Sequence, residues 1–100
     1  IPLFKVTPIY PRRAQERGIQ GYSIVAFTIT ETGTVEDVVP LEGFCGDPTD
    51  PATEYRKCSI FNSAASRAAL KLKYKPKIVD GNAVKVYDVP HKFTFILEDL

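Results

Sequence analysis

Apolar residues recur at every second position between residues 21 and 30, which is the spacing of a β-strand. Gly33 closes the short polar connection that follows, where a backbone with positive φ is favourable, and residues 34–41 resume the strand pattern. We therefore predict a β-hairpin. Because Pro40 lacks a backbone N–H, it should lie at an edge or an end of the second strand. The alternating apolar positions of the first strand are Val25, Phe27 and Ile29.

Two helices are predicted, one before and one after this hairpin. Pro11 is placed to be the first residue of a short helix that continues through residues 12–17, and Gly18 can adopt the left-handed conformation that ends it. A second helix is predicted from Phe61 to Tyr74, where apolar residues recur at three- and four-residue spacing. Most of them are alanines, so this helix should pack on the sheet through small side chains. They are Phe61, Ala64, Ala65, Ala68, Ala69 and Leu72.

The last part of the chain is predicted to form strand after a turn at residues 80–82. Apolar positions fall on even numbers before Pro90 and on odd numbers after it, so a bulge or break between Asp88 and His91 should reset the register. Pro90 also favours an edge position for this strand. The predicted fold is α+β, with two helices packed on one face of an antiparallel sheet. The sheet should have three strands, or four if residues 83–97 form two.

Composition limits what the chain can do. Its 100 residues, 44% of them hydrophobic, are expected to form one domain (residues 1–100) with a modest core and little room for an enclosed substrate pocket. With 13 Lys and Arg against 12 Asp and Glu, no basic surface indicates nucleic acid. No run approaches the roughly 18 apolar residues of a membrane span, and no signal peptide is recognisable. Because the sequence opens with Ile1 and contains no Met, we expect a fragment of a longer protein.

Cys45 and Cys58 flank a polar stretch that contains two prolines, which predicts a surface loop. A bond between the two sulfurs would close a loop of about 14 residues, a closure worth about 3 kcal/mol by chain entropy. We favour this disulfide, which would indicate an oxidising compartment. Two free thiols are the main alternative. A metal site is a further alternative, although no second pair of ligands accompanies the cysteines.

Seven short motifs occur in order along nearly the whole chain. They are P-I-Y-P-R-R-A at 8–14, G-I-Q-G-Y at 18–22, F-T-I-T-E-T-G-T-V-E-D-V at 27–38, F-N-S-A-A at 61–65, Y-K-P at 74–76, V-D-G at 79–81 and V-P-H-K-F at 89–93. In this order and at these spacings they resemble the C-terminal domain of the TonB family. The resemblance implies the α+β fold of that domain.

Four features depart from the pattern of that family. Leu72 stands where the family usually has Trp, and Ser66 stands where it prefers Leu, so the second helix should present less bulk to the sheet. Thr7 replaces a Gln that the resemblance links to receptor contact. The loop between the two cysteines is longer than the usual connection.

The resemblance implies energy transduction rather than catalysis, without a metal or another cofactor. Family members span the periplasm of Gram-negative bacteria from an inner-membrane anchor, which would lie in a segment absent from this sequence. Through that N-terminal region they work with an ExbB/ExbD-type motor. Their C-terminal domain grips a short extended segment, the TonB box, of an outer-membrane TonB-dependent receptor. The expected outcome is active import of scarce nutrients such as siderophores or vitamin B12.

The expected contact is β-strand addition, because an edge strand carries unpaired backbone donors and acceptors. The candidate residues of the last strand are His91, Phe93, Thr94, Phe95, Ile96 and Leu97. Their side chains are equally explained by one buried face of a sheet. The resemblance adds residues from the entry motif, although these could simply begin a helix or, for the arginine, carry a solvated charge. They are Thr7, Pro8, Tyr10, Pro11 and Arg13.

Two other features have an ordinary structural explanation. His91 is the only histidine and has no partners spaced as metal ligands or as a catalytic set, so we interpret it as an exposed strand residue. Four lysines between residues 71 and 77 could steer an acidic partner or anionic lipid, but a solvated face explains them.

Other functions and assembly states remain open at this stage. The alternatives to transduction are a TolA-like module for interactions in the cell envelope and a TonB-like tail on a membrane peptidase sensor. We expect a monomer, or a weak dimer formed by strand swapping, because an edge strand can pair with a second copy.

Overall fold

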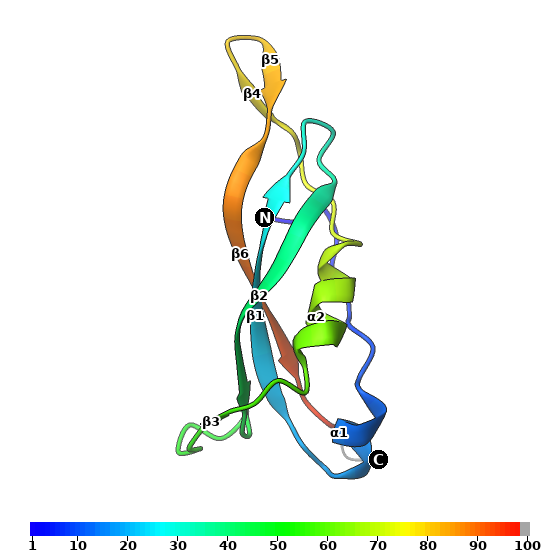
Figure 1. The fold of residues 1–100 in the computed structure, drawn as a ribbon, viewed down its shortest axis with the longest axis vertical. Coiled ribbons are helices and arrows are strands. Elements are labelled where there is room, and N and C mark those ends of the chain that lie inside the picture. Colours follow the sequence, from blue (N-terminus) through cyan, green and yellow to red (C-terminus); the bar gives the residue numbers. More distant parts are fainter. Residues whose placement is uncertain (99–100) are drawn as a thin grey trace.

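The computed structural model describes residues 1–98 and forms an elongated molecule of 49 × 25 × 22 Å (Figure 1). A four-stranded antiparallel sheet has the strand order β3-β2-β1-β6, and a separate two-stranded sheet pairs β4 with β5. In chain order, the elements are α1 (Arg12–Glu16), β1 (Gly21–Ile29), β2 (Val35–Cys45), β3 (Arg56–Lys57), α2 (Asn62–Ala69), β4 (Lys77–Val79), β5 (Asn82–Val84) and β6 (Val86–Phe95).

The predicted α+β fold is confirmed. β1 lies at the centre of the sheet, pairs with β2 as the predicted hairpin, and pairs with β6 on its other side. α2 packs across β1 and β2, whereas α1 lies where β1 begins and β6 ends (Figure 1). Ala14 of α1 is fully buried in the same core. In the described part of the chain, neither helix is long and apolar enough to cross a membrane.

The core lies between the sheet and the small-residue face of α2. Phe61 stacks on Phe95 with a centroid distance of 4.4 Å, and the ring of Tyr10 meets both edge-on. All six apolar positions predicted to line the inner face of the second helix are buried. The alanines let the helix approach the sheet closely, so the aromatic rings from β1 and β6 fill the remaining space.

The predicted change of register in β6 is confirmed as a bulge. Asp88 has a φ of 54°, and the pairing with β1 shifts between Phe27 and Ile29. The inserted residue moves the buried positions from even to odd numbers, because side chains alternate with a period of two. Pro40 lies inside β2, but β3 pairs only with Phe44 and Cys45, so the outer edge of β2 is unpaired at Pro40. The prediction of an edge position for this proline is confirmed.

The second helix ends earlier than predicted. It stops at Ala69 instead of Tyr74, and the amides of Lys71 and Leu72 donate to carbonyls three residues back, which tightens the last turn. The chain then leaves the helix because its backbone bonds elsewhere: the Tyr74 amide donates to the Gly33 carbonyl at 2.9 Å. Leu72 and Tyr74 are still buried, so the apolar spacing predicted their burial but extended the helix too far.

The turn predicted at residues 80–82 is present, and it connects a hairpin that the sequence pattern did not show. Asp80 and Gly81 both have positive φ, as a tight two-residue hairpin turn requires. β4 and β5 are mostly exposed and project beyond the main sheet (Figure 1). The predicted strand segment from residue 83 onward is divided at Lys85, so β5 and β6 belong to different sheets.

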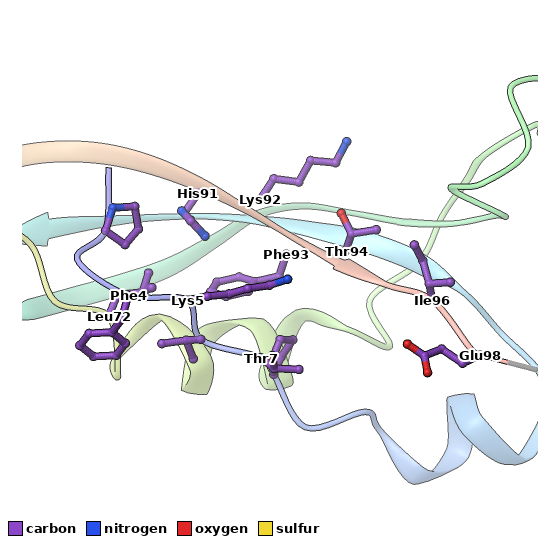
Figure 2. A pocket seen from close by; sticks show the side chains of 13 residues that line it. Phe4, Lys5, Thr7, Leu72, His91, Lys92, Phe93, Thr94, Ile96 and Glu98 are labelled. Atoms are coloured by element: carbon purple, nitrogen blue, oxygen red, sulfur yellow. The ribbon is translucent and has the colours of Figure 1, made fainter. Parts of the chain in front are cut away.

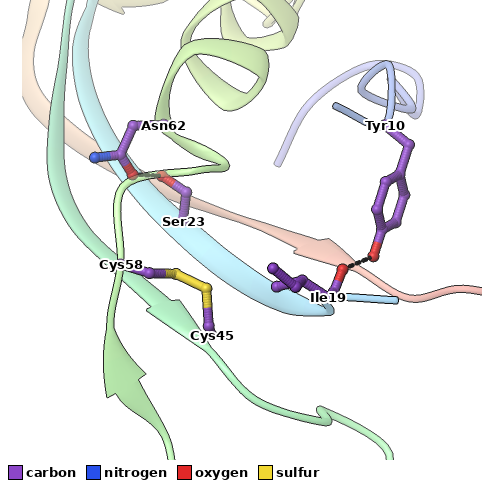
Figure 3. The surroundings of a disulfide bond; sticks show 6 residues. All are labelled: Tyr10, Ile19, Ser23, Cys45, Cys58 and Asn62. Carbon is purple, nitrogen blue, oxygen red and sulfur yellow. Dashed lines mark hydrogen bonds between the residues drawn. A yellow bond between two sulfur atoms is a disulfide. The ribbon is translucent and has the colours of Figure 1, made fainter. Parts of the chain in front are cut away.

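The predicted disulfide is present between Cys45 and Cys58 (Figure 3). It joins the end of β2 to the segment before α2, with a Cα–Cα distance of 5.7 Å. Beside it, the hydroxyl of buried Ser23 donates to Oδ1 of Asn62 at 3.0 Å, which fixes the start of α2 against β1. The loop between the cysteines is not entirely irregular, because two of its residues form β3.

Candidate functional site

β6 is the last strand of the main sheet, so one of its edges has no neighbouring strand within residues 1–98. The prediction that the final strand lies at an edge is therefore confirmed. Of the residues predicted to bind a partner, four lie in β6, and Ile96 and Leu97 follow it directly. Those in the strand are His91, Phe93, Thr94 and Phe95.

Backbone groups alternate in direction along β6. In an antiparallel strand, alternate residues point both their N–H and C=O groups toward the same side. Pro90 has no N–H, and it is accommodated without loss where its backbone faces the open edge. Lys92 and Thr94 have the same parity, so their backbone groups face outward too. Odd-numbered residues should direct their backbone groups toward β1 instead. The Leu97 amide agrees with this, because it faces β1 and donates to Oε1 of Gln20 at 2.7 Å.

A groove of about 690 Å³ follows this open edge (Figure 2). β6 forms one wall, and the N-terminal segment, which we define as residues 1–10, forms the other. Phe93 and Leu72 line it between the two walls and are almost fully buried, with 4% and 2% of their surfaces exposed. The groove is thus an elongated space beside unpaired backbone, with an apolar floor.

The N-terminal segment is extended and only lightly bound to the rest of the molecule. The Leu3 amide donates to the Lys73 carbonyl at 2.8 Å, and within the described chain residues 1–9 make no other backbone hydrogen bond. Thr7 and Pro8, both predicted as partner contacts, line the same groove as β6. The structure therefore brings these two residues together with His91, Phe93 and Thr94.

The remaining predicted residues of the entry motif lie outside this groove. The Tyr10 hydroxyl donates to the Ile19 carbonyl, and burial raises the pKa of Tyr10, so it stays a donor (Figure 3). Pro11 is predicted to be the first helical residue, but it lies immediately before α1, which begins at Arg12. Arg13 is exposed and lines a small pocket with Arg17 and Arg56. Tyr10 and Pro11 thus position the segment, and Arg13 offers a separate cationic surface.

The charges around β6 are modest. The ring of His91 lies 4.7 Å from that of Phe93, and burial lowers the pKa of His91 below its usual value of 6.5. His91 is therefore neutral at pH 7. On the opposite face of the sheet, the Lys92 ammonium lies 4.2 Å from the centroid of the Tyr22 ring. Among residues 1–98, Glu98 is the one acidic side chain that lines the groove.

Sequence reasoning missed the second wall of the groove and the part played by Lys92. The N-terminal segment has no periodic pattern, so nothing in it predicts that Phe4, Lys5 and Val6 lie beside β6. Residues two apart in a strand direct their backbone groups to the same side. The position of Pro90 at an open edge could therefore have predicted that the backbone groups of Lys92 also point outward. Among residues 1–98, no group of three His, Cys, Asp or Glu side chains could hold a metal ion.

Comparison with known proteins identifies the family of the chain. The sequence model of the family described as Gram-negative bacterial TonB protein C-terminal matches residues 6–43. The chain is 32% identical over 83 residues to the protein TonB of Pseudomonas aeruginosa, a match that includes 83% of this chain. The chain spans about a fifth, 21%, of the length of that relative.

Two solved structures are similar over nearly the whole chain. The solution structure of the P. aeruginosa TonB C-terminal domain has a TM-score of 0.68 and 31% identity, with 100% of this chain and 88% of that one covered. The structure of the TonB2 protein from Vibrio anguillarum has a TM-score of 0.61 and 30% identity, covering 99% and 82%. The chain therefore belongs to the TonB C-terminal domain family, a family of non-enzymatic domains.

Proposed function

We propose that this chain is the periplasmic receptor-binding domain of a TonB-type energy transducer. In this proposal it binds the TonB box of an outer-membrane receptor as an additional strand beside β6. Family membership supports the type of function, and one structural observation carries the mode of binding. That observation is the open edge of β6, which a groove of about 690 Å³ follows. Strand addition uses such an edge because backbone pairing supplies affinity for an extended segment of varied sequence.

The proposed strand has defined hydrogen-bonding partners. Lys92 and Thr94 direct their N–H and C=O groups outward, so an incoming strand can form two bonds with each in an antiparallel ladder. Thr7 and Pro8, in the opposite wall, would contact its side chains. Each backbone bond contributes about 0.5–1.5 kcal/mol, so a short segment gains moderate affinity with a fast release.

Arg13 is proposed to extend the contact beyond the strand. It lies on α1, outside the groove, and its guanidinium would meet an acidic side chain of the receptor plug. Because Arg13 is exposed, such a pair would add little affinity and mainly orient the receptor.

The direction of force also suits this arrangement. A pull along the strand axis would load several backbone bonds at once, whereas a pull across the ladder would break them one at a time. We propose that an ExbB/ExbD-type motor supplies this pull through an inner-membrane anchor that precedes the domain. The receptor would then admit a scarce nutrient such as a siderophore or vitamin B12. The disulfide agrees with the oxidising periplasm.

The test is isothermal titration with peptides copied from the periplasmic N-termini of receptors of the same organism. Saturable binding is expected, and a proline in the centre of the peptide should abolish it because one backbone donor is lost. A scrambled peptide of the same composition is the control. Absence of binding above that control, both for the peptides and for the intact receptors, would contradict the proposal.

A further inference from the structure

A second groove lies on the other side of the N-terminal segment. Its volume is about 720 Å³, and it runs between residues 7–12 and α2. Thr7 and Pro8 line both this groove and the one beside β6, so the N-terminal segment separates the two. We call it the α2 groove. Strand addition to β6 leaves it unused.

The α2 groove exposes large apolar side chains. Ile9 on one wall has 78% of its surface exposed, and Leu70 on the other has 57%. Between them, Ala64 and Ala68 are too small to fill the space, so the helix presents a hollow rather than a ridge. Two large apolar side chains exposed along one groove of a small domain favour a binding surface, because their exposure to water is unfavourable.

The same groove carries a local positive charge. Arg12, Arg67 and Lys71 line it, and no Asp or Glu in the described part of the chain does. Across residues 1–98, the one ion pair joins Lys85 to Glu36, so none of these three cations is paired there. The whole chain has a net charge of only +1. The positive charge around the groove is therefore local, and it comes from these three unpaired cations.

We propose that the α2 groove binds an acidic, apolar segment of a partner protein. Leucine- or isoleucine-like side chains of that segment would cover Ile9 and Leu70, and its carboxylates would meet the guanidinium groups of Arg12 and Arg67. The apolar residues lie within a groove and not on a convex surface, which suits an inserted peptide better than a lipid headgroup layer. The partner segment in the α2 groove therefore makes a second contact, separate from that of the strand added beside β6.

The test uses the 15N-labelled 100-residue chain and a short peptide in which Asp or Glu alternates with Leu. Backbone amides of Ile9, Leu70 and Lys71 should shift on titration, while those of Thr94 should not. A peptide with Lys in place of each acidic residue should bind at least about tenfold more weakly, and added salt should weaken binding of the acidic one.

Matched variants separate the groove from general charge. The double substitution R67E/K71E reverses two charges in the groove and should weaken acidic-peptide binding by about tenfold or more. The control is K73E/K75E, which changes the net charge equally at two exposed lysines outside the groove. Both should bind a receptor peptide at β6 as the unmodified chain does.

Three outcomes would overturn the proposal. The first is equal binding of the acidic and basic peptides, and the second is equal loss in both double variants. The third is that a second copy of the chain or a lipid, and not a peptide, occupies the α2 groove. Dimerisation that L70D abolishes would show that a second copy covers it. Binding to anionic vesicles that R67E/K71E removes, without peptide binding, would assign it to lipid instead.

Discussion

The hydroxyl of Tyr10 donates a hydrogen bond to the carbonyl oxygen of Ile19, just before β1 begins. The Tyr10 ring also meets Phe61 and Phe95 edge-on, at centroid distances of 5.8 and 5.7 Å. One side chain thus joins the N-terminal segment to the core and to the end of β6. The position of one groove wall relative to the other depends on this contact.

Replacing Tyr10 with Phe should remove the hydrogen bond and leave the ring in place. The free energy of unfolding should fall by about 0.5–1.5 kcal/mol, measured by urea denaturation. Tyr87 offers a matched control, because 67% of its surface is exposed and its hydroxyl has no hydrogen-bond partner among the described residues. Y87F should leave stability unchanged. A Y10F variant as stable as the unmodified chain would show that the bond is not formed in solution.

Loss of the disulfide should destabilise the domain by about 3 kcal/mol, because a loop of about 14 residues is no longer closed in the unfolded chain. Denaturation of the unmodified chain with and without a reducing agent measures this difference. The C45A/C58A variant is the control, since reduction should not change its stability. Equal midpoints for the oxidised and reduced unmodified chain would contradict the pairing of Cys45 with Cys58.

Gly33 and Gly81 should respond differently to alanine. Both have positive φ, 84° and 81°, so a side chain at either position is strained by about 1 kcal/mol. At Gly81 an added Cβ meets open space, whereas at Gly33 it would collide with the carbonyl oxygen of Tyr74. G33A should therefore lose clearly more stability than G81A in urea denaturation. Equal losses would mean that the Tyr74 segment does not pack against this turn.

The stability of the domain should depend on the protonation of His91. Burial lowers its pKa in the folded chain below 6.5, so the unfolded chain takes up a proton first as the pH falls. The His91 contribution should be constant well above pH 6.5, and stability should decrease as the pH falls through this value. H91Q should lose this part of the decrease between pH 7.5 and 5.5. A histidine titration by NMR that gives a pKa at or above 6.5 would contradict this prediction.

The regular part of the fold could be predicted because its signals are local. The two-residue period of β1 and the change of parity around Asp88 each reflect which side chains face one core. The end of α2 could not be predicted in this way. Leu72 and Tyr74 keep the helical spacing, but a long-range bond from the Tyr74 amide to Gly33 redirects the backbone.

The candidate site was only half predictable. The strand that supplies the open edge follows from Pro90, because proline cannot donate within a ladder. The opposite wall depends on where residues 1–10 fold back, and this is set by the Leu3 bond to Lys73 and the Tyr10 bond to Ile19. Neither contact produces a periodic pattern in the amino-acid sequence. The α2 groove was missed for the same reason, since Ile9 and Leu70 line one groove only after that segment is placed.

The most direct test of strand addition compares two substitutions at Thr94, whose side chain is exposed. T94P removes the outward N–H and should weaken binding of a receptor peptide by about tenfold or more, because the partner carbonyl is left unpaired. T94A keeps that N–H and should bind as the unmodified chain does. Both should keep the same circular dichroism spectrum, since Thr94 does not donate to β1. Peptide binding by T94P equal to that of T94A would contradict the assignment of the β6 edge as the receptor site.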